Sequence, residues 1–443
     1  MRTNLKTHGS AQTHEGAATR PSQPAKELRR AIMACMLWES TFYESGDTHA
    51  ARVAALCKQV SFQELASAAV DARERFKLRH APLFLVREAL RYHKGRQVGD
   101  LINRVIQRPD ELGELLSLYW RENPQAPLAA QLKIGLARAL KKFNAYQLAK
   151  WSKDGAVKLR DVLFLSHAKP RDDVQAALFK QLTENTLETP DTWEVALSGG
   201  TDKAEAFTRL LAEKKLGALA LLRNLRGMLE AGVSEDVIRD GLASMSVERV
   251  LPFRFVTAAR YAPRLEDALE SAMLKCLETA PKLTGKTAIL IDHSGSMFGT
   301  KVSAKSEIDR FDAACALAML VRETCERARV FAFADNCVEV PPRRGFALAQ
   351  AIKQCMPPGG TRLGAAVNYV YTVYPECERL IVLTDEQSAD RQQHPRGRGY
   401  IINVGTYQNG IAYGPWVSID GWSEAVLDFI REYETEEETT SPQ

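Results

Sequence analysis

The spacing of apolar residues changes character once along the chain, near residue 285. From about residue 26 to residue 284 apolar positions recur every three or four residues, as in ELRRAIMACMLWESTFY and FQELASAAVDARERF. That period is typical of amphipathic helices. Breaks such as RENPQAP and LSGGTDK separate these segments and predict short helices joined by turns. We expect stacked helix pairs of the HEAT or armadillo kind.

After Lys286 the pattern becomes one of strands that alternate with helices. The runs TAILI, ARVFAFA, ERLIVLT and GYIINV are short and continuously apolar, as strands buried on both faces are. Amphipathic segments over residues 307–328 and 344–355 lie between them. This order predicts a doubly wound, largely parallel sheet, with ligands at the carboxyl ends of its strands. The expected fold class is therefore mainly α plus α/β.

Composition and charge divide the chain into four regions and restrict its function. We expect disordered ends over residues 1–25 and 436–443, a helical domain over 26–285 and an α/β domain over 286–435. The net charge of +4 is mild, so binding to nucleic acid has to rely on local basic patches. Residues 1–25 lack the apolar stretch of a signal peptide, and no apolar run is long enough to predict a membrane span. The eight scattered cysteines, without a CxxC pair, favour free thiols in a reducing cytoplasm.

Oxygen-bearing side chains cluster where three loops follow the predicted strands. AILIDHSGSM places two hydroxyls and a carboxylate directly after a strand, MPPGGTRLGAAV places a threonine before a helix, and RLIVLTDEQS ends a strand on an aspartate. Hard divalent cations such as Mg²⁺ prefer ligands of this kind. The predicted ligands of one Mg²⁺ site are Asp292, Ser294, Ser296, Thr361 and Asp385. His293 lies between them, and we expect it to face solvent rather than act as a base.

This pattern resembles the metal-ion-dependent adhesion site of von Willebrand factor A domains, in which a DxSxS loop, a Thr and an Asp hold the cation. All five positions are matched here. Two carboxylates and three neutral hydroxyls leave the metal able to accept an acidic group from a partner. That is binding chemistry, and these loops offer no evident general base.

A second cluster, of basic and aromatic residues, occupies residues 135–170 of the helical half. Phosphate contacts and base stacking need this combination, although a solvated helix face has the same composition. Phe143, Tyr146 and Trp151 are the interleaved aromatic residues. The predicted RNA contacts are Arg138, Lys141, Lys142, Lys150, His167 and Lys169.

Several sequence motifs of this half also resemble those of a known family. KKFNAYQLAKW, VKLRDVLFLSHAKP, TPDTWEVALSGG, KLGALALLRNLRGMLEAGV and VLPFRFVTAAR are similar to successive signatures of the TROVE module, the RNA-binding ring of the Ro ribonucleoprotein family. LWESTFYESGD looks like the bacterial branch. The family's RNA-critical histidine falls on His167 and a family lysine falls on Lys150. Animal members carry a basic residue where this chain has Asp154, with Lys153 and Lys158 nearby to supply charge.

The resemblance implies a non-enzymatic role in RNA quality control. A helical ring would accept single-stranded ends of defective RNA, and the outer basic surface would bind a small structured non-coding RNA, the Y RNA or a bacterial counterpart. An exoribonuclease is an expected partner, and we expect a monomer. Another class of protein has a similar composition: adaptors that join a metal-bearing A domain to an AAA+ ATPase. A metal-dependent phosphodiesterase is a third option, weakened by the lack of paired carboxylates for two ions.

Overall fold

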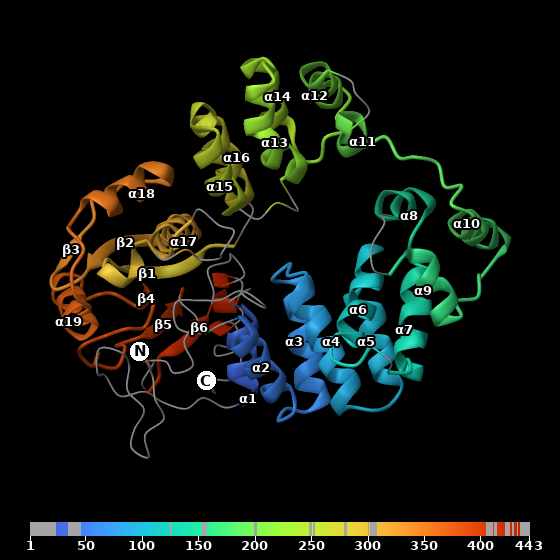
Figure 1. Ribbon diagram of the computed structural model, residues 1–443. Coiled ribbons are helices and arrows are strands. Elements are labelled where there is room, and N and C mark those ends of the chain that lie inside the picture. Colours follow the sequence, from blue (N-terminus) through green and yellow to red (C-terminus); the bar gives the residue numbers. More distant parts are fainter. Residues whose placement is uncertain are drawn as a thin grey trace. The chain divides into compact units, whose positions relative to one another are not determined.

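The chain divides into two compact units in the computed structural model (Figure 1). The first comprises Pro24–Leu37 and Ala50–Gly199, and the second comprises Met1–Gln23, Trp38–His49 and Gly200–Gln443. The structure describes residues 24–33, 46–124, 126–152, 157–198, 202–247, 250, 253–278, 281–299, 301, 308–404, 411, 414–420, 426–427, 429–431 and 433–434. The disordered ends predicted at 1–25 and 436–443 fall almost wholly outside these residues, as do Cys35 and most of LWESTFYESGD.

The first unit consists of short helices that pack on their neighbours along the chain. Their bounds are α1 Pro24–Met33, α2 Gly46–Cys57, α3 Phe62–Glu74, α4 His80–Tyr92, α5 Arg96–Val105, α6 Asp110–Trp120, α7 Ala130–Leu140, α8 Ala145–Trp151, α9 Leu159–Ser166, α10 Asp173–Glu184 and α11 Trp193–Ser198. Packing joins α3 to α4, α4 to α6, α5 to α7 and α7 to α9. Local signals set the helix starts: Ser61 and Glu64 form a reciprocal capping box before α3. The predicted helical pairs are confirmed.

The second unit begins with more helices of the same kind. They are α12 Lys203–Ala212, α13 Ala218–Glu230, α14 Glu235–Ser244, α15 Phe253–Tyr261 and α16 Glu266–Glu278, with a single 3-10 turn at Pro263–Leu265. Packing joins α13 to α15, α14 to α16 and α15 to α16. Strand structure then starts at Leu283, close to the change of pattern in the sequence.

A six-stranded sheet follows, in the order β3-β2-β1-β4-β5-β6. The strands are β1 Leu283–Asp292, β2 Cys325–Phe333, β3 Cys337–Glu339, β4 Arg379–Thr384, β5 Arg398–Asn403 and β6 Val417–Asp420. All neighbours pair in parallel except β2 with β3. From β1 the chain goes to β2 on one side and later returns to β4 on the other, so the topological switch point lies between β1 and β4. Ligands of doubly wound sheets bind there.

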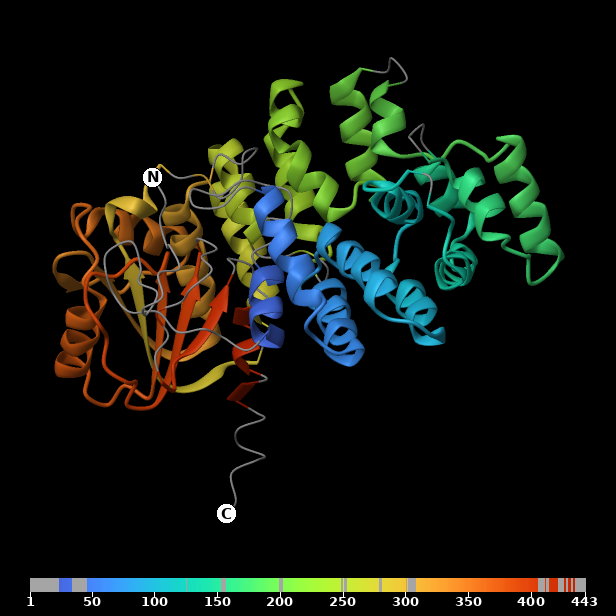
Figure 2. The ribbon, with the colours of Figure 1, turned by 60° about the horizontal axis from the view of Figure 1, so that its bottom comes forward.

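Helices cover both faces of this sheet, which Figure 2 shows with its strands side by side. Alternate residues of β1, among them Ala288 and Leu290, pack with α19 (Leu363–Val373) in one core. On the other face α17 (Arg310–Thr324) contacts β1, β2 and β4, and α18 (Gly345–Gln354) packs on α17. Because α17 lies between the sheet and other helices, it is buried almost all round.

The fold class expected from the sequence is confirmed, with differences at element ends. The predicted helix over 307–328 ends at Thr324, and β2 begins at the next residue, Cys325. The short strands β3 and β6 were not predicted. The described cysteines are free thiols. Within the described part of the chain no helix combines the length and apolar character needed to cross a membrane.

Candidate metal centre and nucleic-acid interface

Asp292 is the last residue of β1 and lies fully buried at the switch point. Its Oδ1 accepts a hydrogen bond from the Ser294 backbone at 2.8 Å, and its Oδ2 accepts one from the Thr384 hydroxyl at 2.5 Å. The hydroxyls of Ser294 and Ser296 lie 3.2 Å apart. The DxSxS turn therefore folds back on itself, so that its carboxylate and both hydroxyls are held together.

Backbone hydrogen bonds tie the three predicted ligand loops to one another. The Gly295 amide donates to the Gly359 carbonyl at 3.0 Å, and the Ala389 amide donates to the Thr361 carbonyl at 2.8 Å. Gly359 needs its lack of a side chain, because a Cβ there would lie 2.5 Å from an Asp335 carboxylate oxygen. The loops of Asp292, Thr361 and Asp385 thus meet at one edge of the sheet, as predicted.

Asp385 follows β4 and is also fully buried. Its Oδ2 lies 3.3 Å from a guanidinium nitrogen of Arg310, and its Oδ1 accepts from the Gln387 amide at 3.3 Å. Burial raises the pKa of Asp385, while Arg310 and a hydrogen bond from Ser296 oppose that rise. Burial and the charge of Asp385 raise the pKa of Asp292 to about 7. Two neighbouring buried carboxylates of this kind require positive charge.

The chemistry of these donors fits a hard divalent cation. The Asp292 carboxylate accepts from the Ser294 amide, the Ser294 hydroxyl and the Thr384 hydroxyl, so one of its four lone-pair sites remains for a metal. The serine hydroxyls are neutral ligands suited to Mg²⁺. Asp292, Ser294, Ser296, Thr361 and Asp385 would hold the ion, which would supply a Lewis-acidic position for an acidic partner group. Thr384, Arg310 and Asp335 were missed from the sequence. Arg310 carried a signal, since a cation at the first residue of a helix opposes the helix dipole.

The prediction that His293 faces solvent is wrong. Its ring is 1% exposed and packs against Phe298 and Phe311, with ring centroids 5.0 and 4.6 Å apart. Side chains alternate along an extended chain, so His293 points into the helical layer when Asp292 points toward the ligand loops. Burial lowers the pKa of His293, which keeps the ring neutral at pH 7.

The second predicted site lies on α7–α10, which adjoin one another within the first unit (Figure 1). The Gln175 side chain at the start of α10 donates to the Lys141 carbonyl at the end of α7, at 3.1 Å. Two of the predicted RNA contacts are engaged in internal interactions. Arg138 pairs with Asp100, and the Lys142 ammonium donates to the carbonyls of Asn103 and Ile106 at the end of α5.

The side chains of the other predicted RNA contacts have no internal hydrogen bonds or ion pairs among the described residues. Among the described residues, the side chains of Lys141, His167 and Lys169 have no hydrogen-bond or ion-pair partner, and Lys150 only faces the Trp151 ring at 5.9 Å. His167 and Lys169 are exposed, and the two other lysines are half-buried along their stems. These four side chains are named here the basic surface. Charges that no carboxylate neutralises are available to phosphates.

His167 has an unusual backbone conformation. It ends α9 with φ 53° and ψ 39°, in the left-handed region, and its amide donates to the carbonyls of Leu163 and Phe164. Glycine or asparagine normally occupies such a position, and another residue costs about 1 kcal/mol. The backbone therefore caps the helix, and the imidazole projects outward without taking part in the cap.

The aromatic residues predicted to stack on RNA bases differ in their exposure. Tyr146 is 52% exposed, but Phe143 is buried, because the turn after α7 directs its ring into the helix core. Trp151 is half-buried, with the Arg108 guanidinium 3.9 Å from its ring centroid. Phe164 was missed, since it lies in the apolar run VLFL that reads as core, yet it is 62% exposed on α9.

Two further basic stretches have structural partners or lie outside the described residues. Lys153 and Asp154 fall outside the described residues. In the basic loop of residues 391–398, Arg396 packs on the Tyr371 ring at 4.7 Å and Arg398 pairs with Glu434 at 2.8 Å. These contacts explain much of that loop's charge without a nucleic acid.

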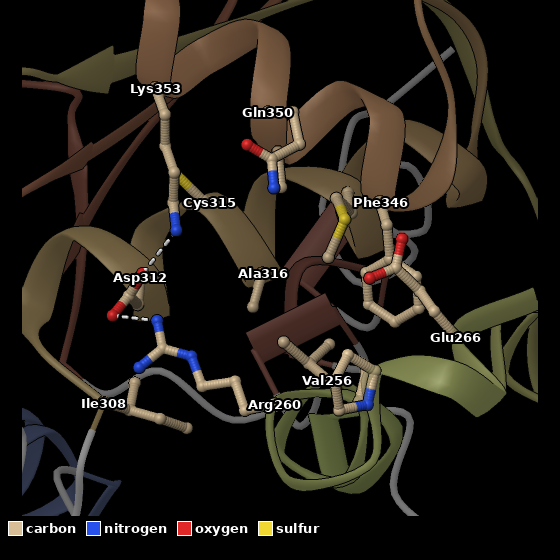
Figure 3. Close-up of a pocket in the computed structure, with 14 residues that line it drawn as sticks. Val256, Arg260, Glu266, Ile308, Asp312, Cys315, Ala316, Phe346, Gln350 and Lys353 are labelled. Carbon is tan, nitrogen blue, oxygen red and sulfur yellow. Dashed lines mark ion pairs between the residues drawn. The ribbon is translucent and has the colours of Figure 1, made fainter.

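A cavity of about 220 Å³ lies among α15, α16, α17 and α18, away from the metal ligands. Figure 3 shows Asp312 of α17 between Lys353 of α18 and Arg260 of α15. The Lys353 ammonium is 2.8 Å from the Asp312 carboxylate. Although burial opposes them, these two cations hold the pKa of Asp312 below its usual range. The cluster joins the last helices before residue 285 to the α/β domain.

Fold and site together define a class of protein: a helical-repeat array followed by a doubly wound domain of the von Willebrand A type. Residues 180–289 match the family profile described as TROVE domain. The crystal structure of the Deinococcus radiodurans RO (RSR) protein is similar with a TM-score of 0.65, over 93% of this chain and 99% of that one, at 16% identity. Telomerase protein component 1 of Rattus norvegicus is 37% identical over 91 residues, 19% of this chain, and the same figures apply to that of Mus musculus.

A TROVE domain is thus matched over about a quarter of the chain, and the two telomerase components resemble it over 91 residues. The likeness to the Deinococcus protein shows the shared fold. The matched segment spans 4% of the length of the two telomerase components. The TROVE match crosses residue 285, so the domain boundary drawn from the sequence there stays a prediction.

Proposed function

We propose that this protein is an RNA-binding component of a ribonucleoprotein particle in the cytoplasm. It would bind a small structured non-coding RNA, similar to Y RNA, on α7–α10. It would take single-stranded ends of defective RNA through its helical repeats, in a non-enzymatic quality-control role. The TROVE match over residues 180–289 and the fold shared with the Deinococcus RO protein support the general RNA-binding role. An exoribonuclease that degrades the captured RNA would be a suitable partner, and a monomer suffices for these contacts.

One observation carries the proposal. Between α7 and α10, Lys141, Lys150 and Lys169 have no carboxylate partner among the described residues, and the same segment exposes Tyr146 and Phe164. Phosphates need the charges and unpaired bases need the rings. Most other basic residues of these helices have acidic or carbonyl partners, as Arg138 and Lys142 do. A face that served only solubility would have no use for two large exposed aromatic rings.

We further propose that the metal centre binds Mg²⁺ and presents it to an acidic group of a protein partner. Asp292, Ser294, Ser296, Thr361 and Asp385 would be the ligands. The assignment of these ligands is supported by the burial of two carboxylates beside serine hydroxyls at the switch point. Asp292→Ala should weaken Mg²⁺ binding in calorimetry and leave RNA affinity unchanged. Equal Mg²⁺ affinity in both proteins would show that these ligands are misassigned.

Sequencing of RNA that co-purifies with the protein tests the main proposal. The wild type should enrich a small structured RNA, and the variant Lys141→Ala/Lys150→Ala/Lys169→Ala should lose it. The matched control is Arg138→Ala/Lys142→Ala, which removes cations that are already partnered and should retain the RNA. If the wild type carries no RNA and instead retains an AAA+ ATPase in a metal-dependent manner, the adaptor function is correct.

A further inference from the structure

Arg310 places a positive charge inside the metal centre. It is the first residue of α17, it is 3% exposed, and its guanidinium contacts the buried carboxylate of Asp385. The helix dipole disfavours a cation at this position, and burial of the guanidinium adds a further cost. The negative charge of Asp385, a predicted metal ligand, therefore offsets the unfavourable helix dipole and the cost of burying the Arg310 guanidinium.

The charges of the two predicted carboxylate ligands and of the guanidinium that contacts one of them can be counted. Asp292 and Asp385 contribute two negative charges when ionised, and Arg310 contributes one positive charge. With both carboxylates ionised and no metal bound, these three side chains have a net charge of −1. A divalent cation changes that to +1, so the guanidinium and the metal then share one carboxylate. Their repulsion is weakly screened, because all three side chains are buried.

The contact between Arg310 and Asp385 supplies charge more than orientation. A single nitrogen approaches at 3.3 Å, whereas charge-assisted pairs that fix geometry are bidentate and shorter, near 2.8 Å. Other donors already orient this carboxylate: the Gln387 amide at 3.3 Å and the Ser296 hydroxyl. Removal of the guanidinium would thus leave the ligand in place and remove a positive charge.

Contacts of the residues that flank Arg310 fix the backbone at the start of α17. Asp309 caps α17 and accepts from the Gly299 amide at 3.2 Å. Asp312, two residues after Arg310, is held between Arg260 and Lys353 (Figure 3). The first turn of α17 cannot withdraw from the site without breaking these contacts. The charge of Arg310 accordingly stays near the ligands when a metal enters.

We propose that Arg310 is the resident cation of the metal centre: it neutralises Asp385 when no metal is bound and thereby lowers the affinity of the site for divalent cations. This rests on the proposed Mg²⁺ site. The protein would be folded and stable without metal, and it would take up Mg²⁺ weakly unless an acidic partner group adds its own negative charge. Arg310 would therefore make metal binding depend on the partner.

Calorimetric Mg²⁺ titration and thermal unfolding in EDTA or in Mg²⁺ test this inference in the full chain. Arg310→Gln should bind Mg²⁺ at least about tenfold more tightly than the wild type, because a buried repulsive charge is removed. Its melting temperature should fall by several degrees in EDTA and recover in Mg²⁺. Arg310→Lys keeps the charge and should resemble the wild type. Arg322→Gln, on the last turn of the same helix and 31% exposed at its side chain, is the matched control and should change neither quantity.

Each result decides between the alternatives. Equal or weaker Mg²⁺ binding by Arg310→Gln overturns the role of Arg310, while the metal centre stands if the wild type binds Mg²⁺ and Asp292→Ala does not. Absence of Mg²⁺ binding in both the wild type and Arg310→Gln overturns both proposals. If Arg310→Gln unfolds in EDTA, refolding on addition of Mg²⁺ supports the inference, and failure to refold contradicts it.

Discussion

The basic surface makes a quantitative prediction about salt. The variant Lys141→Ala/Lys150→Ala/Lys169→Ala removes three ammonium groups that have no acidic partner among the described residues. The comparison variant, Arg138→Ala/Lys142→Ala, removes two cations from the same helices whose charges are already partnered. Both variants lower the net charge of the region, so that a general electrostatic effect alone would make them similar.

Counterion release sets the size of the difference. Each phosphate that a cation neutralises contributes about 0.9 to the slope of log K against log salt for duplex nucleic acid and about 0.7 for single strands. Loss of three contacts should therefore reduce the slope by about 2 to 3. Between 50 and 200 mM salt, the affinity of the triple variant should change about 20- to 40-fold less than that of the wild type.

The double variant should differ in stability instead. The exposed pair of Arg138 and Asp100 contributes about 0 to 1 kcal/mol, and the carbonyl contacts of Lys142 at the end of α5 contribute about 1 kcal/mol. The free energy of unfolding should thus fall by about 1 to 2 kcal/mol with the salt slope unchanged.

Filter binding of one labelled structured RNA at four or more salt concentrations measures the slopes, and urea unfolding followed by circular dichroism measures stability. The loss of slope should be similar for every structured RNA tested, because phosphate contacts carry no sequence information. The reasoning is refuted if the double variant loses as much slope as the triple variant, since partnered and unpartnered cations would then be equivalent.

Three further predictions concern single residues. Phe164→Ala should weaken RNA binding by about 5- to 100-fold, as loss of one stacked base does, with little change in melting temperature because the ring is 62% exposed; unchanged RNA affinity would exclude stacking there. In EDTA, the free energy of unfolding should fall by up to about 4 kcal/mol as the pH rises from about 4 to about 7. The reason is that the pKa of Asp292 is raised to about 7 in the folded protein, so the folded protein keeps a proton there that the unfolded chain has already released. Asp292→Asn should flatten that dependence in chemical denaturation, and an equally steep curve would contradict it. Asp312→Asn should destabilise the protein by about 1 to 3 kcal/mol, since it leaves Arg260 and Lys353 facing each other without their carboxylate; a melting temperature equal to that of the wild type would show that the cluster is unimportant.

The sequence predicted the fold where local periodicity and burial agree. The strands that became β1, β2, β4 and β5 are continuously apolar, and the structure buries them between helices. The end of α17 was misjudged, because Cys325–Ala328 continues a helical pattern and only pairing with β1 makes it a strand. The short strands β3 and β6 depend on their neighbours and have little pattern of their own.

The sites were predictable to the extent that their chemistry lies in short motifs. The DxSxS turn, Thr361 and Asp385 could be found because each follows or precedes an element with a clear pattern. The position of Arg310 at a helix start signals a partner without naming it, and Phe164 could not be assigned, since both roles depend on what each side chain faces after folding. Lys142 looked equivalent to Lys141 in sequence, and only the approach of α5 separates them.

The central proposal, that α7–α10 bind a specific small RNA, is tested most directly at His167. Its imidazole projects from the end of α9 and has no partner among the described residues, so its expected role is a directed hydrogen bond or stacking contact. His167→Ser should abolish binding of the co-purified small RNA and preserve the salt slope of residual, nonspecific binding. His80→Ser, at a surface histidine of α4 that is 62% exposed at its side chain, is the control and should bind as the wild type does. Full affinity for the small RNA in a His167→Ser protein with a native circular dichroism spectrum would contradict the proposal.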